Sequence, residues 1–124
     1  MWFDRGDDGL KLHDEQLEQS SVEEFRQETT KVRGLSELFA VLGDETRTKI
    51  VFLLSLHPLC THDIATILGV TLPTVSHHLR IMRLMRLVKH VRRGKRVIYE
   101  LNDHHIVDLI RIAMDHYSET EHEE

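Results

Sequence analysis

The chain has 124 residues, 40% of them hydrophobic, and a formal net charge of −5, so it suits one compact domain and lacks an overall basic charge for nucleic acid. No apolar run approaches the roughly 20 residues of a membrane span, and the acidic start broken by glycines is not a signal peptide. The single cysteine, Cys60, excludes an intramolecular disulfide and suits a reducing compartment, so we expect a cytoplasmic protein.

The chain begins with an acidic arm. Residues 1–20 have weak periodicity and many acids, which favours a mobile segment. A helix is expected over residues 22–30. A second is expected over residues 35–42, where leucine and phenylalanine recur at helical spacing, and Gly43 should end it.

Two further helices follow, each preceded by a capping residue. Asp44 is expected to cap the first, which ends before Pro58 because proline restricts the residue that precedes it. Thr61 is expected to cap a short helix over residues 62–68, and Gly69 should end that helix in the left-handed conformation.

Another helix follows this short one after a brief turn. Thr71 precedes it, and Pro73 lies in its first turn, where a missing N–H costs little. Its apolar side carries Val75, Leu79 and Met82. The other side carries His77, Arg80 and Leu84. One side therefore faces a core and the other is open to a ligand.

Two strands come next, over residues 88–92 and 97–101, and Gly94 between them suits a tight hairpin. A short helix, a turn, a second helix and a basic hairpin are typical of a winged helix-turn-helix. We therefore predict a mainly α fold with a small β-hairpin, made by residues 21–119 and followed by an acidic tail over 120–124.

The charge is unevenly distributed. Residues 80–96 hold eight basic side chains and no acid, whereas residues 1–30 hold nine acids against three bases. A basic patch of this kind binds phosphates even in an acidic protein. The alternative is a solvated basic face. The coincidence of the charge with the helix and hairpin signals favours binding to double-stranded DNA.

The candidate DNA contacts lie on the second helix of the motif and on the hairpin. In such a unit the second helix enters the major groove, and short or planar donors suit base edges and phosphates. His77 and His78 either contact DNA or pack against other helices. The candidate residues are Thr74, Ser76, His77, His78, Arg80, Arg92, Arg93, Lys95 and Arg96.

The last helix, which begins at Asn102 or Asp103 and reaches about Ser118, carries metal-binding residue types at two places. Asp103-x-His105 and His116-x-x-Glu119 supply nitrogen and oxygen ligands for an ion such as zinc. The two histidines are eleven residues apart, so they lie within about 20° of one face but roughly 16 Å apart along the axis. One straight helix cannot bring both pairs to one ion, whereas two antiparallel helices related by a two-fold axis can.

Plainer interpretations exist for the same side chains. Asp103 alone could be only a helix N-cap, and His105 and His116 could be polar residues in a dimer interface. The rest of their face is apolar, and buried histidines need partners, so a metal explains all four residues together. His122 is a candidate extra ligand, which would favour nickel or cobalt over tetrahedral zinc.

The segments LGDETRTKIVFLL, PTVSHHLRIMRLMRLV and VRRGKRVIYEL resemble the ArsR/SmtB metalloregulatory repressors of bacteria, over roughly residues 32–119. The Asp103, His105, His116 and Glu119 pattern matches that family's sensing site, which joins two subunits. The resemblance implies a repressor that binds an operator as a metal-free homodimer and is released by Zn2+, with Co2+ or Ni2+ as alternatives.

The same family uses a cysteine motif at the start of the first helix of the helix-turn-helix. At the matching place this chain has LCTHDIA, in which Cys60 is the one thiol and His62 stands where a second cysteine often lies. A thiolate-rich site is therefore not expected. The candidate second site is a mixed one from Cys60, His62, Asp63 and His13.

Three other functions compete with a metal sensor. A winged-helix regulator could sense redox state or another signal through Cys60, and a constitutive DNA-binding protein would bind no metal. A metal hydrolase would need an open coordination position and a general base. All four ligand positions are protein side chains here, so we expect neither an enzyme nor a small organic substrate.

Overall fold

The computed structural model describes residues 12–13 and 16–122. The chain divides into two compact units, residues 1–36 and 37–124. Most of the predicted arm lies outside the described residues. The described part of the N-terminal unit contains a short antiparallel pair of strands, a helix and a 3-10 helix: β1 (Leu12–His13), β2 (Gln16–Leu17), α1 (Gln19–Thr29) and η2 (Thr30–Val32). The boundary between the units falls within the next helix, α2 (Leu35–Leu42).

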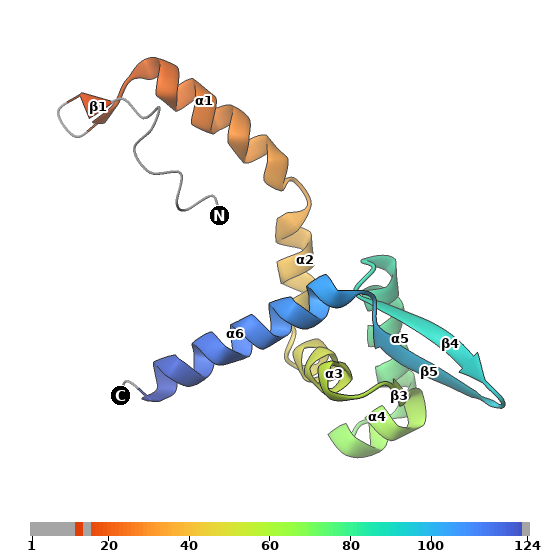
Figure 1. Ribbon diagram of the computed structural model, residues 1–124. Coiled ribbons are helices and arrows are strands. Elements are labelled where there is room, and N and C mark those ends of the chain that lie inside the picture. The colour runs from red at the N-terminus through yellow and green to blue at the C-terminus, as the bar shows by residue number, and fades with distance from the viewer. Residues whose placement is uncertain (1–11, 14–15, 123–124) are drawn as a thin grey trace. The chain divides into compact units, whose positions relative to one another are not determined.

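The second unit holds the predicted helix-turn-helix and hairpin (Figure 1). After α2, its elements are α3 (Glu45–Leu56), β3 (Leu59–Cys60), α4 (Thr61–Leu68), α5 (Leu72–Leu84), β4 (Val88–Arg93), β5 (Arg96–Leu101) and α6 (His104–His122). None of the described helices combines the length and the apolar character needed to cross a membrane.

Local sequence signals set most of these boundaries. Asp44 caps α3 by accepting a hydrogen bond from the Arg47 N–H at 3.0 Å, as expected. Gly69 ends α4 with φ +68°, and Gly94 lies in the hairpin turn with φ +64°. The expected cap of α4 was wrong by one residue: Cys60 is the N-cap, and its side chain makes no capping hydrogen bond.

The end of α5 has no glycine. Arg86 follows the helix with φ +58°, in the left-handed region that glycine adopts most easily. Its N–H donates to the Arg83 carbonyl at 3.0 Å, and the Leu87 N–H donates to the Met82 carbonyl at 2.9 Å. These two bonds form a Schellman motif with an arginine at the glycine position.

The core joins α3, α4 and α5 to the sheet. The predicted apolar side of α5, Val75, Leu79 and Met82, is fully buried. It packs in one cluster with residues of α3, α4, the turn after α5 and the strands: Ile50, Val51, Leu54, Ile64, Ala65, Leu87, Val88 and Leu101. This shared core fixes α5 and the hairpin as one body with α3.

The sheet has one strand more than the sequence predicted. β4 and β5 form the expected antiparallel hairpin, in which Arg93 pairs with Arg96 across the turn. β3 adds to the other edge of β5 and places Leu59 opposite Tyr99. The order β3-β5-β4 ties the start of α4 to the hairpin.

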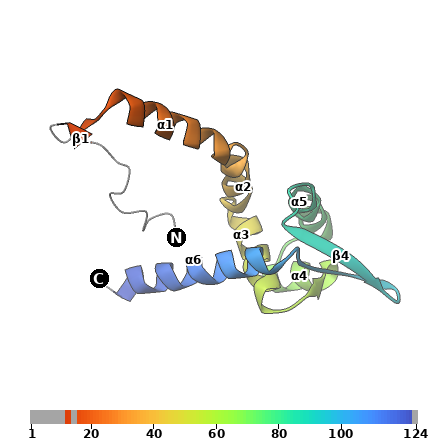
Figure 2. The ribbon, with the colours of Figure 1, turned by 45° about the horizontal axis from the view of Figure 1, so that its top comes forward.

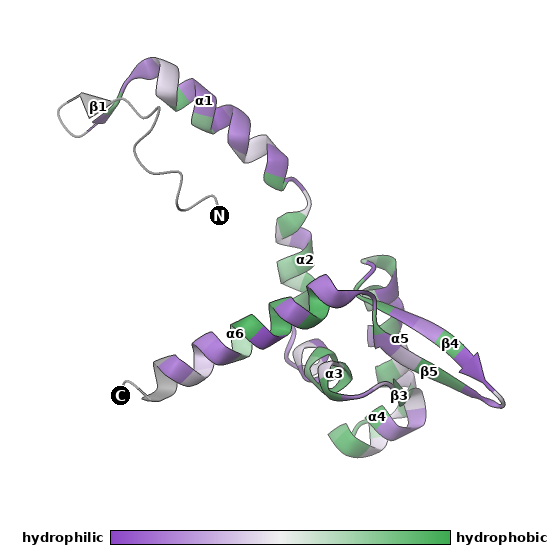
Figure 3. Cartoon of the chain, in the orientation of Figure 1, coloured by the Kyte–Doolittle hydropathy of each residue, from purple (hydrophilic) through white to green (hydrophobic). Residues whose placement is uncertain are grey.

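The last helix, α6, runs four residues beyond the expected Ser118. Ile106, Val107 and Ile110 pack against the core, whereas the side chains of residues 111–119 are all exposed. In both ribbon views the first part of α6 lies beside α3, and the rest of the helix extends away from the helix-turn-helix (Figures 1 and 2). Hydrophobic colour is concentrated in its first half (Figure 3).

Candidate functional site

The recognition helix α5 presents a polar side to solvent because its apolar side is buried. Ser76, His77 and Arg80 are exposed. Thr74 is half-buried, and its hydroxyl lies 2.8 Å from that of Thr71, the N-cap residue. Three of the candidate DNA contacts on this helix are therefore accessible to a groove.

His78 differs from its neighbours on the same helix. Its side chain is 14% exposed and points toward α3. Its Nδ1 lies 3.3 Å from Nη1 of Arg47 and 4.0 Å from Oδ2 of Asp44. Burial lowers the pKa of His78 below its usual value of 6.5. The structure thus places His78 in packing between helices, the other role considered for it.

The hairpin carries the candidate phosphate contacts. Arg92, Arg93, Lys95 and Arg96 are all exposed. Hydrophilic colour covers β4 toward the tip of the hairpin (Figure 3). On the face of the hairpin that carries Arg93 and Arg96, the part away from the turn is neutralised by a cross-strand pair. In this pair, Nζ of Lys89 lies 3.7 Å from Oε1 of Glu100. The cationic charge is therefore concentrated around the turn.

Asp103 and His105 come together at the start of α6. Oδ1 of Asp103 lies 3.5 Å from Nδ1 of His105, whose side chain is 94% exposed. The same Oδ1 accepts the Ile106 N–H at 3.2 Å, and Oδ2 accepts Nδ2 of Asn102 at 3.3 Å. The Ile106 N–H lowers the pKa of Asp103, so its carboxylate is ionised. Asp103 is thus an N-cap that also stands beside a candidate ligand.

His116 and Glu119 lie further along α6 and are exposed. Across the part of the chain that the structure describes, no three His, Cys, Asp or Glu residues lie close enough to hold a metal. For the four candidates on α6 the helical rise explains this result, because it separates the two pairs by roughly 16 Å. The four-residue site stays a prediction that needs a second chain.

Among the described side chains of the candidate second site, Cys60, His62 and Asp63 do not form a cluster of three metal-ligand residues. Cys60 is 7% exposed and belongs to β3, whereas His62 is exposed and Asp63 is half-buried on α4. His13 lies in β1 of the N-terminal unit, and its side chain lies outside the described part of the structure. This site also stays a prediction.

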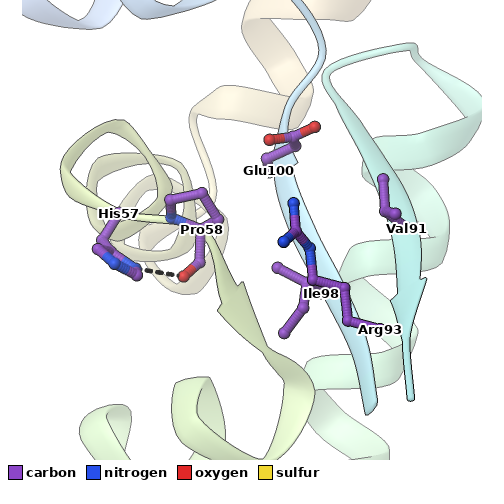
Figure 4. A pocket seen from close by; sticks show the side chains of 6 residues that line it. All are labelled: His57, Pro58, Val91, Arg93, Ile98 and Glu100. Carbon is purple, nitrogen blue, oxygen red and sulfur yellow. Dashed lines mark hydrogen bonds between the residues drawn. The ribbon is translucent and has the colours of Figure 1, made fainter. Parts of the chain in front are cut away.

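A hollow of about 300 Å³ lies on the outer side of the hairpin sheet. Pro58, Val91 and Ile98 give it an apolar floor (Figure 4). Nδ1 of His57 donates a hydrogen bond to the Pro58 carbonyl, and the Arg93 side chain reaches along β5 in the direction of Glu100 (Figure 4). These residues are not arranged as a nucleophile with a base, so the hollow offers no catalytic chemistry.

Sequence reasoning missed Arg47 and the second role of Asp44. Asp44 was recognised as a cap, but nothing in the spacing of α3 shows that its first turn contacts α5. The available signal was His78 itself, which follows the buried Val75 by three residues and therefore lies beside the apolar side of α5.

Comparisons with known proteins give a consistent result. A family profile described as "Bacterial regulatory protein, arsR family" matches residues 44–90. A transcriptional repressor SmtB homolog of Synechocystis sp. is 36% identical over 110 residues, covering 89% of this chain and 82% of that protein. A cadmium resistance transcriptional regulatory protein, a CadC homolog of Staphylococcus aureus, is 33% identical over 109 residues, covering 87% and 88%.

Among solved structures, the homodimeric winged helix-turn-helix DNA-binding domain of Mb0332 from Mycobacterium bovis has a TM-score of 0.72. It covers 79% of this chain and 91% of its own, at 21% identity, so it bears on the fold alone. The predicted winged helix-turn-helix is confirmed.

Proposed function

The chain belongs to the ArsR family of bacterial regulatory proteins, which are DNA-binding transcriptional regulators and not enzymes, and from this we propose that it is a metal-sensing repressor. In this proposal the metal-free homodimer binds operator DNA. Zinc, or cobalt or nickel, binds across the dimer interface and releases the DNA.

The DNA-facing surface combines α5 with the hairpin. Ser76, His77 and Arg80 are exposed on α5, where side chains reach base edges in the major groove. The four cations around the hairpin turn, Arg92, Arg93, Lys95 and Arg96, would contact phosphates. His78 is left out of this surface because it faces α3.

The position of the two ligand pairs on α6 is the observation that carries the metal site. Asp103 and His105 lie within 3.5 Å of each other at one end of the helix, and His116 and Glu119 lie on its exposed second half. Two nitrogen and two oxygen donors suit a tetrahedral zinc ion, and also cobalt or nickel. Each pair would be completed by the opposite pair of a second, antiparallel α6.

The face of α6 that carries His105 and His116 also carries an exposed apolar side chain. Ile112 is 66% exposed and follows His105 by seven residues, so it lies within about 20° of that histidine around the helix. A second copy of α6 packed on this face would cover Ile112 and would supply the missing ligands at the same time.

Release then follows from a change in how the two subunits are oriented. The two recognition helices of a dimer must be about 34 Å apart to read successive major grooves. A metal bound across the α6 seam favours the orientation that suits its ligands, and it weakens DNA binding by its differential affinity for the two orientations. Metal and DNA must then antagonise each other reciprocally.

The test uses DNA that the metal-free protein selects from a random pool of duplexes, labelled for fluorescence anisotropy. Zinc is titrated into the complex of the wild type, of His105→Ala/His116→Ala and of His104→Ala. His104 is the matched control because it is exposed but points about 100° away from His105. Release from the wild type and the control, but not from the double variant, is the expected result. DNA affinity that zinc leaves unchanged in the wild type would sink the metal switch.

The alternative sensor, Cys60, gains little support. Cys60 is 7% exposed as a residue, so an oxidant reaches it poorly. The variant Cys60→Ser separates the two functions, because loss of inducer response with α6 intact would favour redox sensing.

A further inference from the structure

A polar cluster joins the recognition helix to α3. We propose that His78 is a positioning residue which, with Arg47 and Asp44, fixes the rotation of α5 on α3 and so sets operator affinity without touching DNA. This inference rests on the proposed DNA-binding function, because it assigns that function a further residue.

The cluster is anchored on both sides. Nε of the Arg47 side chain donates to the Val41 carbonyl at 2.7 Å, and the Arg47 backbone N–H donates to Oδ2 of Asp44 at 3.0 Å. Its Nη1 lies 3.3 Å from Nδ1 of His78. One guanidinium therefore connects the end of α2, the first turn of α3 and the middle of α5. Such a planar, multiply bonded group leaves little freedom to the side chains that it holds.

The contact requires a neutral imidazole. A guanidinium has donors but no acceptor, so Nδ1 of His78 must be the acceptor, and the ring proton is on Nε2. The charged groups that face this ring are Asp44 and Arg47 from α3, with His77 from its own helix at a ring distance of 5.6 Å. Burial lowers the pKa of His78, which agrees with a neutral ring near neutral pH.

Small rotations of α5 matter for reading DNA. His78 lies between His77 and Arg80, which are candidate base and phosphate contacts on the open side of the helix. Side-chain tips lie about 5–6 Å from a helix axis, so a rotation of about 10° moves them by about 1 Å. Hydrogen bonds tolerate only a few tenths of an ångström around 2.9 Å. Loss of the cluster should therefore weaken sequence-specific contacts most.

A direct phosphate contact by His78 makes a different prediction. Each lost phosphate contact lowers the slope of log K against log salt by about 0.9 and weakens binding to all DNA sequences alike. A positioning residue leaves the salt slope and the non-specific affinity as they are. The two roles are therefore separable by one set of binding curves.

The experiment compares His78→Leu, which removes the acceptor, with His78→Asn, whose side-chain oxygen can replace Nδ1 as an acceptor. Arg92→Ala is the positive control for a lost phosphate contact, because Arg92 is exposed on the hairpin and is proposed to contact phosphate. Affinity is measured at several salt concentrations for the duplex selected by the wild type and for calf thymus DNA, and thermal melting checks that each variant is folded. We expect His78→Leu to weaken binding to the selected duplex about tenfold, the size of one good base contact, and His78→Asn to recover most of it.

Two results would overturn the proposal. A salt slope reduced by about 0.9 per subunit in His78→Leu makes His78 a phosphate contact, and an unchanged affinity for the selected duplex gives it no role. Nitrogen NMR of the free protein tests the cluster without DNA: a proton on Nδ1 of His78 also overturns it. If the wild type selects no duplex at all, the proposed repressor function fails, while the NMR result still decides whether the cluster exists.

Discussion

The turn of the hairpin places two like charges opposite each other, which gives a prediction for stability as well as for DNA binding. Arg93 and Arg96 are paired in register and both are exposed. Like charges at directly opposed positions destabilise a strand pair, on the scale of 0.2–1 kcal/mol that cross-strand pairs contribute. Because the Arg93 side chain leans along β5 toward Glu100 (Figure 4), we expect a value near the lower end, about 0.3 kcal/mol.

The variant Arg96→Thr removes this repulsion. We expect it to raise the free energy of unfolding by about 0.3 kcal/mol at low ionic strength, and less at 0.15 M salt, where the Debye length is about 8 Å. Arg92→Thr is the matched control. It brings the same gain in strand propensity, but Arg92 pairs with Val97, so the substitution removes no repulsion between directly opposed charges. Urea unfolding of both variants at two salt concentrations makes the comparison.

The same variant should weaken DNA binding. A dimer loses two phosphate contacts, so the slope of log K against log salt should fall by about 1.8. The reasoning is refuted by a gain in stability no larger than that of Arg92→Thr, or by an unchanged salt slope. Together these outcomes would show whether the charge at the turn lowers stability in exchange for DNA affinity.

Three other predictions follow from single features. Gly69→Ala places a Cβ at φ +68° with no atom within 4 Å, so backbone strain alone should lower the free energy of unfolding by about 1 kcal/mol. Arg86→Gly relieves the same kind of strain at φ +58° and should raise the free energy of unfolding by a similar amount. Urea unfolding measures both. Burial holds the pKa of His78 below 6.5, so on acidification the imidazole takes up its proton in the unfolded chain before it does in the folded one. Stability should therefore fall as the pH drops below 6.5. Thermal melts at a series of pH values measure this dependence, and His78→Asn should flatten it. Ligand imidazoles must be unprotonated, so zinc affinity measured by calorimetry should fall on acidification in the wild type, and His105→Ala should remove most of the binding.

Much of the fold was predictable because local rules set it. Asp44 caps α3, Gly69 ends α4, and the apolar spacing of α5 matches its buried side. The two-residue strand β3 was not predicted, since a segment so short has no alternation to detect. The C-terminal cap of α5 was not predicted either. The left-handed residue after this helix is Arg86, and an arginine does not mark a helix end in the sequence as a glycine does.

The candidate site divides along the same line. The exposed cations of the hairpin and the pairing of Asp103 with His105 could be expected from charge and spacing, since both lie within one local element. The inward direction of His78 depends on Arg47, which is 31 residues away along the chain. Contacts between distant segments are set by packing, so the spacing of His78 after Val75 could indicate that it lies beside the apolar side of α5, but not that its partner is Arg47.

The packing of α3 also bears on where a metal switch can act. α3 contacts both α5 and α6, and its buried residues Ile50, Val51 and Leu54 lie in one core with those of α5. A close-packed core of this kind resists internal sliding. We therefore expect the proposed release to come from reorientation of one subunit against the other, with the core around α3 and α5 moving as one body in each protomer.

Distances between spin labels distinguish these two kinds of motion. One label pair joins exposed positions on the α5 helices of the two subunits, and the other joins α5 and the start of α6 within one subunit. Zinc should change the first distance and leave the second as it was. A change confined to the second distance would place the switch inside the protomer, and the cluster of Arg47 with His78 would then be the first contact between α3 and α5 to examine.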